Sequence, residues 1–130
     1  MSESNPKTTL YPLDIKLQKR SRRLLIEFSN GKNFSLSAEY LRVYSPSAEV
    51  RGHGQKEPTL VFHKQNVNID SIEIVGRYAV RLIFDDGHDT GIYSWSLLYE
   101  LGSHKNANWK RYLERTEEAG HLRNSEPNDG

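Results

Sequence analysis

Residues 78–102 constrain the fold more than any other stretch of this chain. They read YAVRLIFDDGHDTGIYSWSLLYELG, which predicts a strand, a tight turn, a return strand and a capped helix with no spare residues between them. Apolar residues alternate with others along the first strand, so one of its faces is expected to be buried. That face carries Tyr78, Val80, Leu82 and Phe84. Asp86-Gly87 predicts a type I′ turn, in which both central residues have positive φ.

The same stretch ends in a predicted helix. Residues 88–93 form the predicted return strand, and Ser94 has the hydroxyl group that caps a helix after it. Gly102 stands where a glycine commonly ends a helix at the C′ position. Ahead of the stretch, Gly76-Arg77 predicts a two-residue type II′ link that follows a strand around residues 72–74.

The first half of the chain predicts a similar succession. Alternating apolar residues indicate strands around residues 13–17, 24–28 and 34–36. Asn30-Gly31 predicts a type I′ turn between the last two strands, and Ser37 is expected to cap a short helix. Two meanders, each followed by a short helix, suggest a loose duplication without matching motifs.

These elements predict one small domain of the α+β class, with antiparallel β meanders or hairpins and two or three short helices. Residues 1–10 are expected to form a flexible leader, residues 11–120 the domain with a C-terminal helix, and residues 121–130 a disordered tail. Asn106 is expected to cap the last helix.

Composition excludes several kinds of function. The chain has 130 residues and a formal net charge of +1, too little for a global field that attracts nucleic acid or an anionic membrane. It has no cysteine, so by itself it forms no disulfide, thiolate nucleophile or cysteine-held iron–sulfur cluster. No apolar run is long enough to cross a bilayer, and we expect a cytoplasmic protein.

The histidines do not indicate a catalytic metal. None of the five begins a His-x-Asp or His-x-Glu pattern, which non-haem iron oxygenases commonly use. The sequence also lacks His-Glu-x-x-His, a nucleophile elbow and a phosphate-binding glycine loop. We therefore expect no enzymatic activity from this chain alone.

A dense group of titratable residues surrounds the turn in the second half. Asp85 and His88 flank the turn and are expected to face each other, and Asp89 follows. In one interpretation the turn requires Asp and Gly, and His88 forms a hydrogen bond with Asp85 or a nearby backbone group. In the other, His88 binds iron or zinc together with Asp85 or Asp89 and with His53. The first interpretation is favoured.

Residues 45–60, SPSAEVRGHGQKEPTL, form the longest irregular stretch within the predicted domain. Loops of this length often carry function. Three of its residues concentrate adaptable polar chemistry, and we predict that they contact a protein partner: Glu49, Arg51 and His53.

Basic residues crowd the first predicted hairpin, namely Lys16, Lys19, Arg20, Arg22 and Arg23. A basic patch can bind phosphate. Charged residues at a strand edge also prevent aggregation between strands, and no aromatic set for stacking bases accompanies these. Nucleic acid is therefore not the expected partner.

Three motifs resemble one known family. LRVYSPSAEVRGHG at 41–54, FDDGHDTGIYSW at 84–95 and LYELG at 98–102 are similar to the gamma-butyrobetaine hydroxylase-like N-terminal domain family, long classed as a domain of unknown function. The similarity covers about residues 12–102. It implies a small β-rich domain with short helices, which precedes a catalytic jelly roll in the hydroxylases and also occurs as stand-alone bacterial proteins.

For the hydroxylases, the resemblance implies a structural zinc held by Cys-x-Cys-x-x-Cys and a histidine. The cysteine positions fall on Ser45, Ser47 and Val50 here, and only His88 remains. Serine hydroxyls are poor zinc ligands and valine is none. We infer that the zinc site is lost, that Ser45, Ser47 and His88 form hydrogen bonds across the same gap, and that no cofactor is required.

The resemblance further implies a connection to iron, because similar domains are appended to iron–sulfur carrier ATPases of the P-loop type. The leading hypothesis is a stand-alone, non-catalytic accessory or protein-interaction module, with an iron–sulfur carrier as the candidate partner. Its predicted contact surface combines the loop 49–54 with the hairpin that contains His88. The alternative is a protein that binds iron or zinc through His88 and nearby carboxylates.

Overall fold

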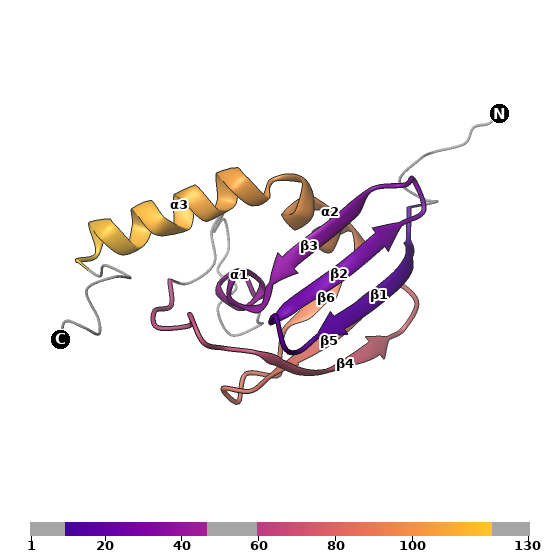
Figure 1. The fold of residues 1–130 in the computed structure, drawn as a ribbon, viewed down its shortest axis with the longest axis horizontal. Coiled ribbons are helices and arrows are strands. Elements are labelled where there is room, and N and C mark those ends of the chain that lie inside the picture. Colours follow the sequence, from indigo (N-terminus) through magenta and orange to yellow (C-terminus); the bar gives the residue numbers. More distant parts are fainter. Residues whose placement is uncertain (1–9, 47–59, 121–130) are drawn as a thin grey trace.

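The fold is seen in a computed structural model that describes residues 10–46 and 60–120. Figure 1 shows the strands gathered together, with α2 and α3 along one side. In chain order the elements are β1 (Pro12–Gln18), β2 (Arg23–Phe28), β3 (Asn33–Ser37), α1 (Ala38–Val43), β4 (Ile69–Val75), β5 (Ala79–Phe84), β6 (Ile92–Ser94), α2 (Trp95–Ser103) and α3 (Lys105–Glu118).

The strands form two antiparallel three-stranded sheets, in the orders β1-β2-β3 and β4-β5-β6. Each sheet is a meander, because strands that follow one another in the chain are paired. Helix α1 follows the first sheet, α2 follows the second and α3 comes last (Figure 1). The predicted α+β class with two meanders is confirmed.

The two sheets share one hydrophobic core. Every second residue of β2 and of β5 is buried, as the two-residue period of a strand requires. Residues of both sheets, α1 and α2 join in a single cluster that includes Leu24, Ile26, Phe28, Leu36, Leu41, Val80, Leu82, Phe84, Tyr93, Leu98 and Leu101. Three of the residues predicted on the buried face of β5 are therefore in the core.

The two halves of the fold repeat the same backbone plan. Strands β1 and β4 each have a register irregularity just after their first residue. Those first residues are Pro12 and Ile69, which pair with Phe28 and Phe84. Each sheet then leads directly into a helix. The duplication suggested by the sequence is thus a structural repeat with one-residue differences in the connections, in which Phe28 corresponds to Phe84.

The hairpins β2–β3 and β5–β6 close in the same way. The N–H of Phe28 donates to the carbonyl of Lys32 at 2.8 Å, and the N–H of Phe84 donates to the carbonyl of His88 at 2.9 Å. Both hairpins therefore have three-residue turns. Because Phe84 lies opposite His88, the predicted pairing of Asp85 with His88 across the hairpin is wrong.

Both turns depend on one glycine each. Gly31 and Gly87 have φ of 89° and 92°, whereas Asn30 and Asp86 are not among the described non-glycine residues with positive φ. A type I′ turn needs two left-handed residues, so both type I′ predictions are wrong. A single left-handed glycine at the third position is typical of the three-residue turn.

The link between β4 and β5 comprises residues 76–78, because Val75 pairs with Ala79. The predicted two-residue link is therefore wrong. Tyr78 lies outside the strand and is 70% exposed, which also corrects its predicted place on the buried face. Its carbonyl accepts the N–H of Trp95 at 2.8 Å and joins the turn to the start of α2.

Serine caps begin both short helices, as predicted. The N–H of Tyr40 donates to Oγ of Ser37 at 3.1 Å, and the N–H of Leu97 donates to Oγ of Ser94 at 3.0 Å. Each cap satisfies one of the N–H groups that the first turn of a helix leaves without a partner.

Gly102 lies inside α2 and not after it, so its predicted role as a C′ residue is wrong. A Cβ atom on Gly102 would lie 2.4 Å from Cγ of Phe34. The absence of a side chain therefore lets α2 approach the first sheet.

Two other boundaries differ from prediction. Helix α3 begins at Lys105 with His104 before it, so Asn106 is in its first turn and is not the cap. The predicted return strand 88–93 is shorter, because regular pairing begins only at Ile92. Residues 1–9 and 121–130, most of the predicted leader and the whole tail, lie outside the described residues. Within the described ranges, no helix is both long enough and apolar enough to cross a membrane.

Candidate functional site

A buried serine and a histidine meet where the two halves of the fold touch. Oγ of Ser45, just beyond α1, lies 2.8 Å from Nε2 of His88, just beyond the β5–β6 turn. Ser45 is only 5% exposed. The predicted hydrogen bond between these two residues is confirmed, and the tautomer of His88 decides which of them donates.

Gly91 makes room for this pair. A Cβ atom on Gly91 would lie 2.3 Å from Oγ of Ser45 and 3.1 Å from Cε1 of Tyr93. The backbone therefore approaches Ser45 more closely than any residue with a side chain would allow.

Tyr93 is a buried residue in contact with Ser45. Its side chain is fully buried, and its hydroxyl donates to the carbonyl of Leu41. Burial raises the pKa of Tyr93 far above its ordinary value, and this outweighs the lowering by the hydrogen bond with Ser45 and by the charge of Arg42. Tyr93 therefore stays protonated and acts as a fixed polar group.

Asp86, at the centre of the same turn, forms ion pairs with two basic side chains. One of its carboxylate oxygens accepts from Nε of Arg42 at 2.9 Å and from Nζ of Lys64 at 2.7 Å. The other accepts the N–H of His88 at 3.1 Å. Burial alone would raise the pKa of Asp86, but the hydrogen bonds from Lys64, His88 and Arg42 lower it to about 2. The ionised carboxylate thus joins α1, the turn and the segment before β4.

Asp85 has a structural task in the same turn. Its carboxylate accepts the N–H of Asn68 at 3.0 Å, and its own N–H donates to the carbonyl of Asn68 at 2.9 Å. The first half repeats this arrangement, because Oγ of Ser29 accepts from Tyr11 and the N–H of Ser29 donates back to it. The turn geometry therefore accounts for the carboxylate of Asp85. Asp89 is exposed next to His88.

Comparison of the halves shows where their chemistry differs. Asp86 corresponds to Asn30 in the repeat, and Arg42 corresponds to Tyr99. In the first half Nδ2 of Asn30 donates to the hydroxyl of Tyr99 at 3.0 Å, and Tyr99 packs edge-to-face on Phe34. The side-chain contact between the turn of one half and the helix of the other is thus neutral for Asn30 with Tyr99 and charged for Asp86 with Arg42.

The close contacts of the glycines are related in the same way. Ser45 against Gly91 corresponds to Gly102 against Phe34, with the small and the larger residue exchanged. One contact is filled by an aromatic ring and the other by a hydroxyl that binds His88. The sequence alone did not identify Arg42, Lys64 or the role of Gly91. Each of them contacts a residue that is distant in the chain, so no local pattern indicates the contact.

The residues present do not fit the structural zinc of the hydroxylases. Ser45 provides a neutral hydroxyl, which is already bound to His88, and Val50 has no donor atom. Ser47 and Val50 lie outside the described residues. Within the described part of the chain no three His, Asp or Glu side chains are grouped so that they could hold a metal. Metal binding by His88 with Asp85 or Asp89 stays a prediction.

Nucleophilic catalysis would require a substrate to reach Oγ of Ser45. A histidine beside a serine can act as a general base, but here the serine is enclosed by Gly91 and Tyr93. The arrangement instead fixes the end of α1 against the second sheet.

The predicted partner-binding residues Glu49, Arg51 and His53 lie outside the described residues. The two described ends of their segment are both held by the same turn. Ser45, on one side, binds His88, and Lys64, on the other side, binds Asp86.

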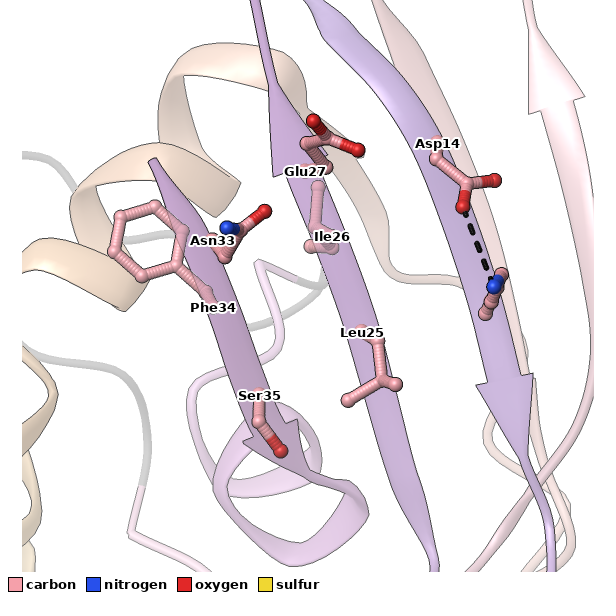
Figure 2. Close-up of a pocket in the computed structure, with 8 residues that line it drawn as sticks. Asp14, Leu25, Ile26, Glu27, Asn33, Phe34 and Ser35 are labelled. Carbon is pink, nitrogen blue, oxygen red and sulfur yellow. Dashed lines mark ion pairs between the residues drawn. The ribbon is translucent and has the colours of Figure 1, made fainter. Parts of the chain in front are cut away.

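A shallow hollow lies elsewhere, on the sheet β1-β2-β3 (Figure 2). Asp14 and Lys16 form an ion pair of 3.8 Å on one of its strands, and Glu27 adds a second acidic group. The lining comprises Asp14, Lys16, Leu25, Ile26, Glu27, Asn33, Phe34 and Ser35. None of the predicted site residues lies there.

Comparison with known proteins agrees with this architecture. The model of the family described as gamma-butyrobetaine hydroxylase-like, N-terminal, matches residues 15–99, which is more than half of the chain. The protein belongs to this family. No curated protein matches it.

Three solved structures resemble this fold. One protein solved by NMR is 51% identical, covers 94% of this chain and 91% of its own, and has a TM-score of 0.78. Another NMR structure is 42% identical, with 88% and 90% covered and a TM-score of 0.76. A protein of unknown function of the DUF971 family from Acidithiobacillus ferrooxidans is 36% identical, with a TM-score of 0.61. The match covers 76% of this chain and 98% of that one, so that structure contains the domain alone.

Proposed function

We propose that this member of the gamma-butyrobetaine hydroxylase-like N-terminal domain family is a non-catalytic protein-interaction module of the cytoplasm. Its contact surface, here named the His88 surface, comprises Arg42, Lys64, Asp86 and His88 with the segment 47–59. Loops on a rigid scaffold commonly carry recognition, and two hairpins with short helices provide such a scaffold here.

The difference between the two halves is the observation that supports this proposal most. The turn of each half contacts the helix of the other half. Asn30, in the turn of the first half, makes this contact with Tyr99 of α2. The second half makes the same contact with the ion pair of Asp86 and Arg42. An ion pair that water still reaches contributes little to stability, because solvent screens the attraction between the two charges. We therefore attribute the charges to recognition.

The segment 47–59 belongs to this surface because of how it is attached. The described fold ends at Pro46, one residue after Ser45, and resumes at Leu60, four residues before Lys64. Ser45 and Lys64 contact neighbouring residues of one turn, His88 and Asp86. The chain therefore leaves and rejoins the described fold beside one turn.

An iron–sulfur carrier protein is the first partner to test. The resemblance to domains appended to such carriers supports this choice, and the absence of cysteine means that cluster ligands would have to come from the partner. The role proposed for this chain is contact with the carrier.

The test is affinity recovery of partner proteins from native cell extract with metal analysis of the recovered complex. Arg51→Ala with His53→Ala is expected to reduce recovery while the melting temperature stays unchanged. The matched control, Arg77→Ala with His104→Ala, changes the same residue types at exposed positions outside the His88 surface. Recovery at the wild-type level with the first variant would show that the surface is wrongly assigned.

A further inference from the structure

The turn between β1 and β2 carries three basic side chains that form no ion pair within the described part of the chain. Lys19, Arg20 and Arg22 are exposed, and none of them forms an ion pair with another described residue. Arg23 follows and is held by Ser35, through its carbonyl at 3.2 Å and its hydroxyl at 3.3 Å. The turn thus combines three available cations with a fourth that the sheet holds in place.

The backbone of this turn is fixed by contacts with other elements. The carbonyl of Lys19 accepts from Nδ2 of Asn68 at 3.0 Å and from the N–H of Arg22 at 3.3 Å. The carbonyl of Arg22 accepts the N–H of Ala38 at 2.9 Å. A turn held in this way presents its side chains from a preorganised backbone, which lowers the entropic cost of binding.

Arg22 occupies a backbone conformation that favours glycine. Its φ is 57°, in the left-handed region, where a side chain costs about 1 kcal/mol or more. The corresponding residue of the other half is Tyr78, whose carbonyl makes the same bond to the start of the following helix. Tyr78 is not among the residues with positive φ. Strain of this kind at an exposed basic residue is typical of a functional position.

The turn adjoins the His88 surface through one residue. Asn68 donates to the carbonyl of Lys19 through its side chain, while its backbone pairs with Asp85 in the turn that leads to His88. The elements joined to or in contact with this turn carry several acidic residues, among them Asp14 of β1, Glu27 of β2, Glu39 of α1 and Asp85. Asp85 already accepts the N–H of Asn68, so its charge is partly compensated there.

We propose that the basic turn of Lys19, Arg20 and Arg22 binds an acidic segment of the partner protein that the His88 surface recognises. This rests on the proposed function. Three exposed cations on one fixed turn, which pair with no acidic residue of the described ranges, complement a short run of carboxylates. A nucleic acid fits less well, because the turn has no aromatic side chain on which a base could stack and the net charge of the chain is only +1.

The probe is a short polyglutamate peptide titrated at low salt into the isotope-labelled full chain, with amide signals followed by NMR. The largest shifts are expected at residues 19–23. Reversal of the three charges, Lys19→Glu, Arg20→Glu and Arg22→Glu, should weaken binding about tenfold or more. The same reversals at exposed Lys32, Arg77 and Lys110 should weaken it less than about twofold.

Equal weakening by both triple variants, or shifts spread over the whole surface, would overturn the proposal in favour of unspecific charge attraction. A second arm replaces the peptide with a short oligothymidine. Tighter binding of the oligonucleotide through residues 19–23 would identify a nucleic-acid site instead and would also overturn the proposal.

Arg22→Gly separates recognition from structure, because glycine adopts the left-handed conformation without strain. The melting temperature is expected to stay the same or rise, while polyglutamate binding weakens. A lower melting temperature with unchanged binding would make Arg22 a purely structural residue and contradict the proposal. If Arg51→Ala with His53→Ala abolishes partner recovery and the reversed turn does not reduce it, the acidic segment is refuted while the proposed function stands.

Discussion

Ser45 reaches to within 2.8 Å of Nε2 of His88 because the residue facing it, Gly91, has no side chain. This relationship joins the end of α1 to the second sheet at the point where the segment 47–59 leaves the described fold. The stability of the His88 surface should therefore depend on Gly91 as much as on the two residues that form the bond.

Gly91→Ala is expected to destabilise the protein by about 1–3 kcal/mol, because the added methyl group would lie 2.3 Å from Oγ of Ser45. Urea unfolding followed by circular dichroism measures this. In the background of Ser45→Ala the same substitution should cost less, since the nearest remaining atoms are Cε1 of Tyr93 at 3.1 Å and Cβ of residue 45 at 3.5 Å. An equal cost in both backgrounds would mean that the tight contact does not set the geometry.

Gly102→Ala tests the corresponding contact in the other half. Helix propensity alone predicts that alanine stabilises α2 by up to about 1 kcal/mol. The distance of 2.4 Å to Cγ of Phe34 predicts the opposite sign, a loss of about 1–3 kcal/mol. The loss caused by Gly102→Ala should shrink in the background of Phe34→Ala, which removes Cγ, Cδ1 and Cδ2 of the ring. A gain in unfolding free energy would show that α2 can move away from the sheet without cost.

Asp86→Asn should remove an acid-dependent part of the stability. The pKa of Asp86 is lowered from 3.8 to about 2 in the folded protein, so its ionised form contributes stability above about pH 4 that is lost as pH falls towards 2. With allowance for solvent screening this contribution is about 1 kcal/mol. Unfolding free energies at pH 7 and pH 3 should differ less in the variant than in the wild type. Asp70→Asn, at an exposed residue without an ion pair to a described residue, should behave like the wild type.

Tyr40 and Tyr93 should ionise last when tyrosinate absorbance is followed with rising pH. Burial raises the pKa of Tyr40 to about 12 despite the hydrogen bond from Asn108, and it raises that of Tyr93 further. Because the folded-state pKa exceeds the ordinary value of 10.0, the stability that the buried neutral hydroxyls contribute is lost only as pH rises above about 10. Ionisation of all seven tyrosines near pH 10 in the folded chain would contradict this burial.

A titration with Zn²⁺ and Fe²⁺ decides between recognition and metal binding at His88. Nε2 is already bound to Ser45, so we expect no shift of the ring signals of His88 at millimolar metal. Ser45→Ala frees this nitrogen and provides the matched comparison. Saturable shifts of His88 in the wild type, accompanied by changes at Asp85 or Asp89, would support the metal-binding alternative.

Local signals in the sequence predicted much of the fold. The caps Ser37 and Ser94 follow from side-chain chemistry, and the buried face of β5 follows from alternation. The predicted type I′ turns were wrong, because Asn-Gly and Asp-Gly suit both a two-residue turn and the second and third positions of a three-residue turn. A one-residue change in turn length then moved His88 opposite Phe84.

Contacts between residues distant in the chain limited how much of the site could be predicted from the sequence. Gly102 has the sequence signature of a helix end, yet its role is the approach of Phe34, which is distant in the chain. Asp86 is explained by Arg42 and Lys64, and neither follows from the turn motif. The pair of Ser45 and His88 was predictable because the resemblance to a known family placed both at one ancestral metal site.

The repeat provides the most direct test of the His88 surface as the contact site. Asp89 and Asn33 are exposed residues at corresponding positions of the two halves, one beside His88 and the other beside Lys32. A photo-crosslinking amino acid placed at each position in living cells compares two sites that both come second after a three-residue turn. The account predicts a discrete crosslinked protein from position 89, reduced by Arg51→Ala with His53→Ala, and none from position 33. Equal crosslinking from both positions, or none from position 89, would contradict it.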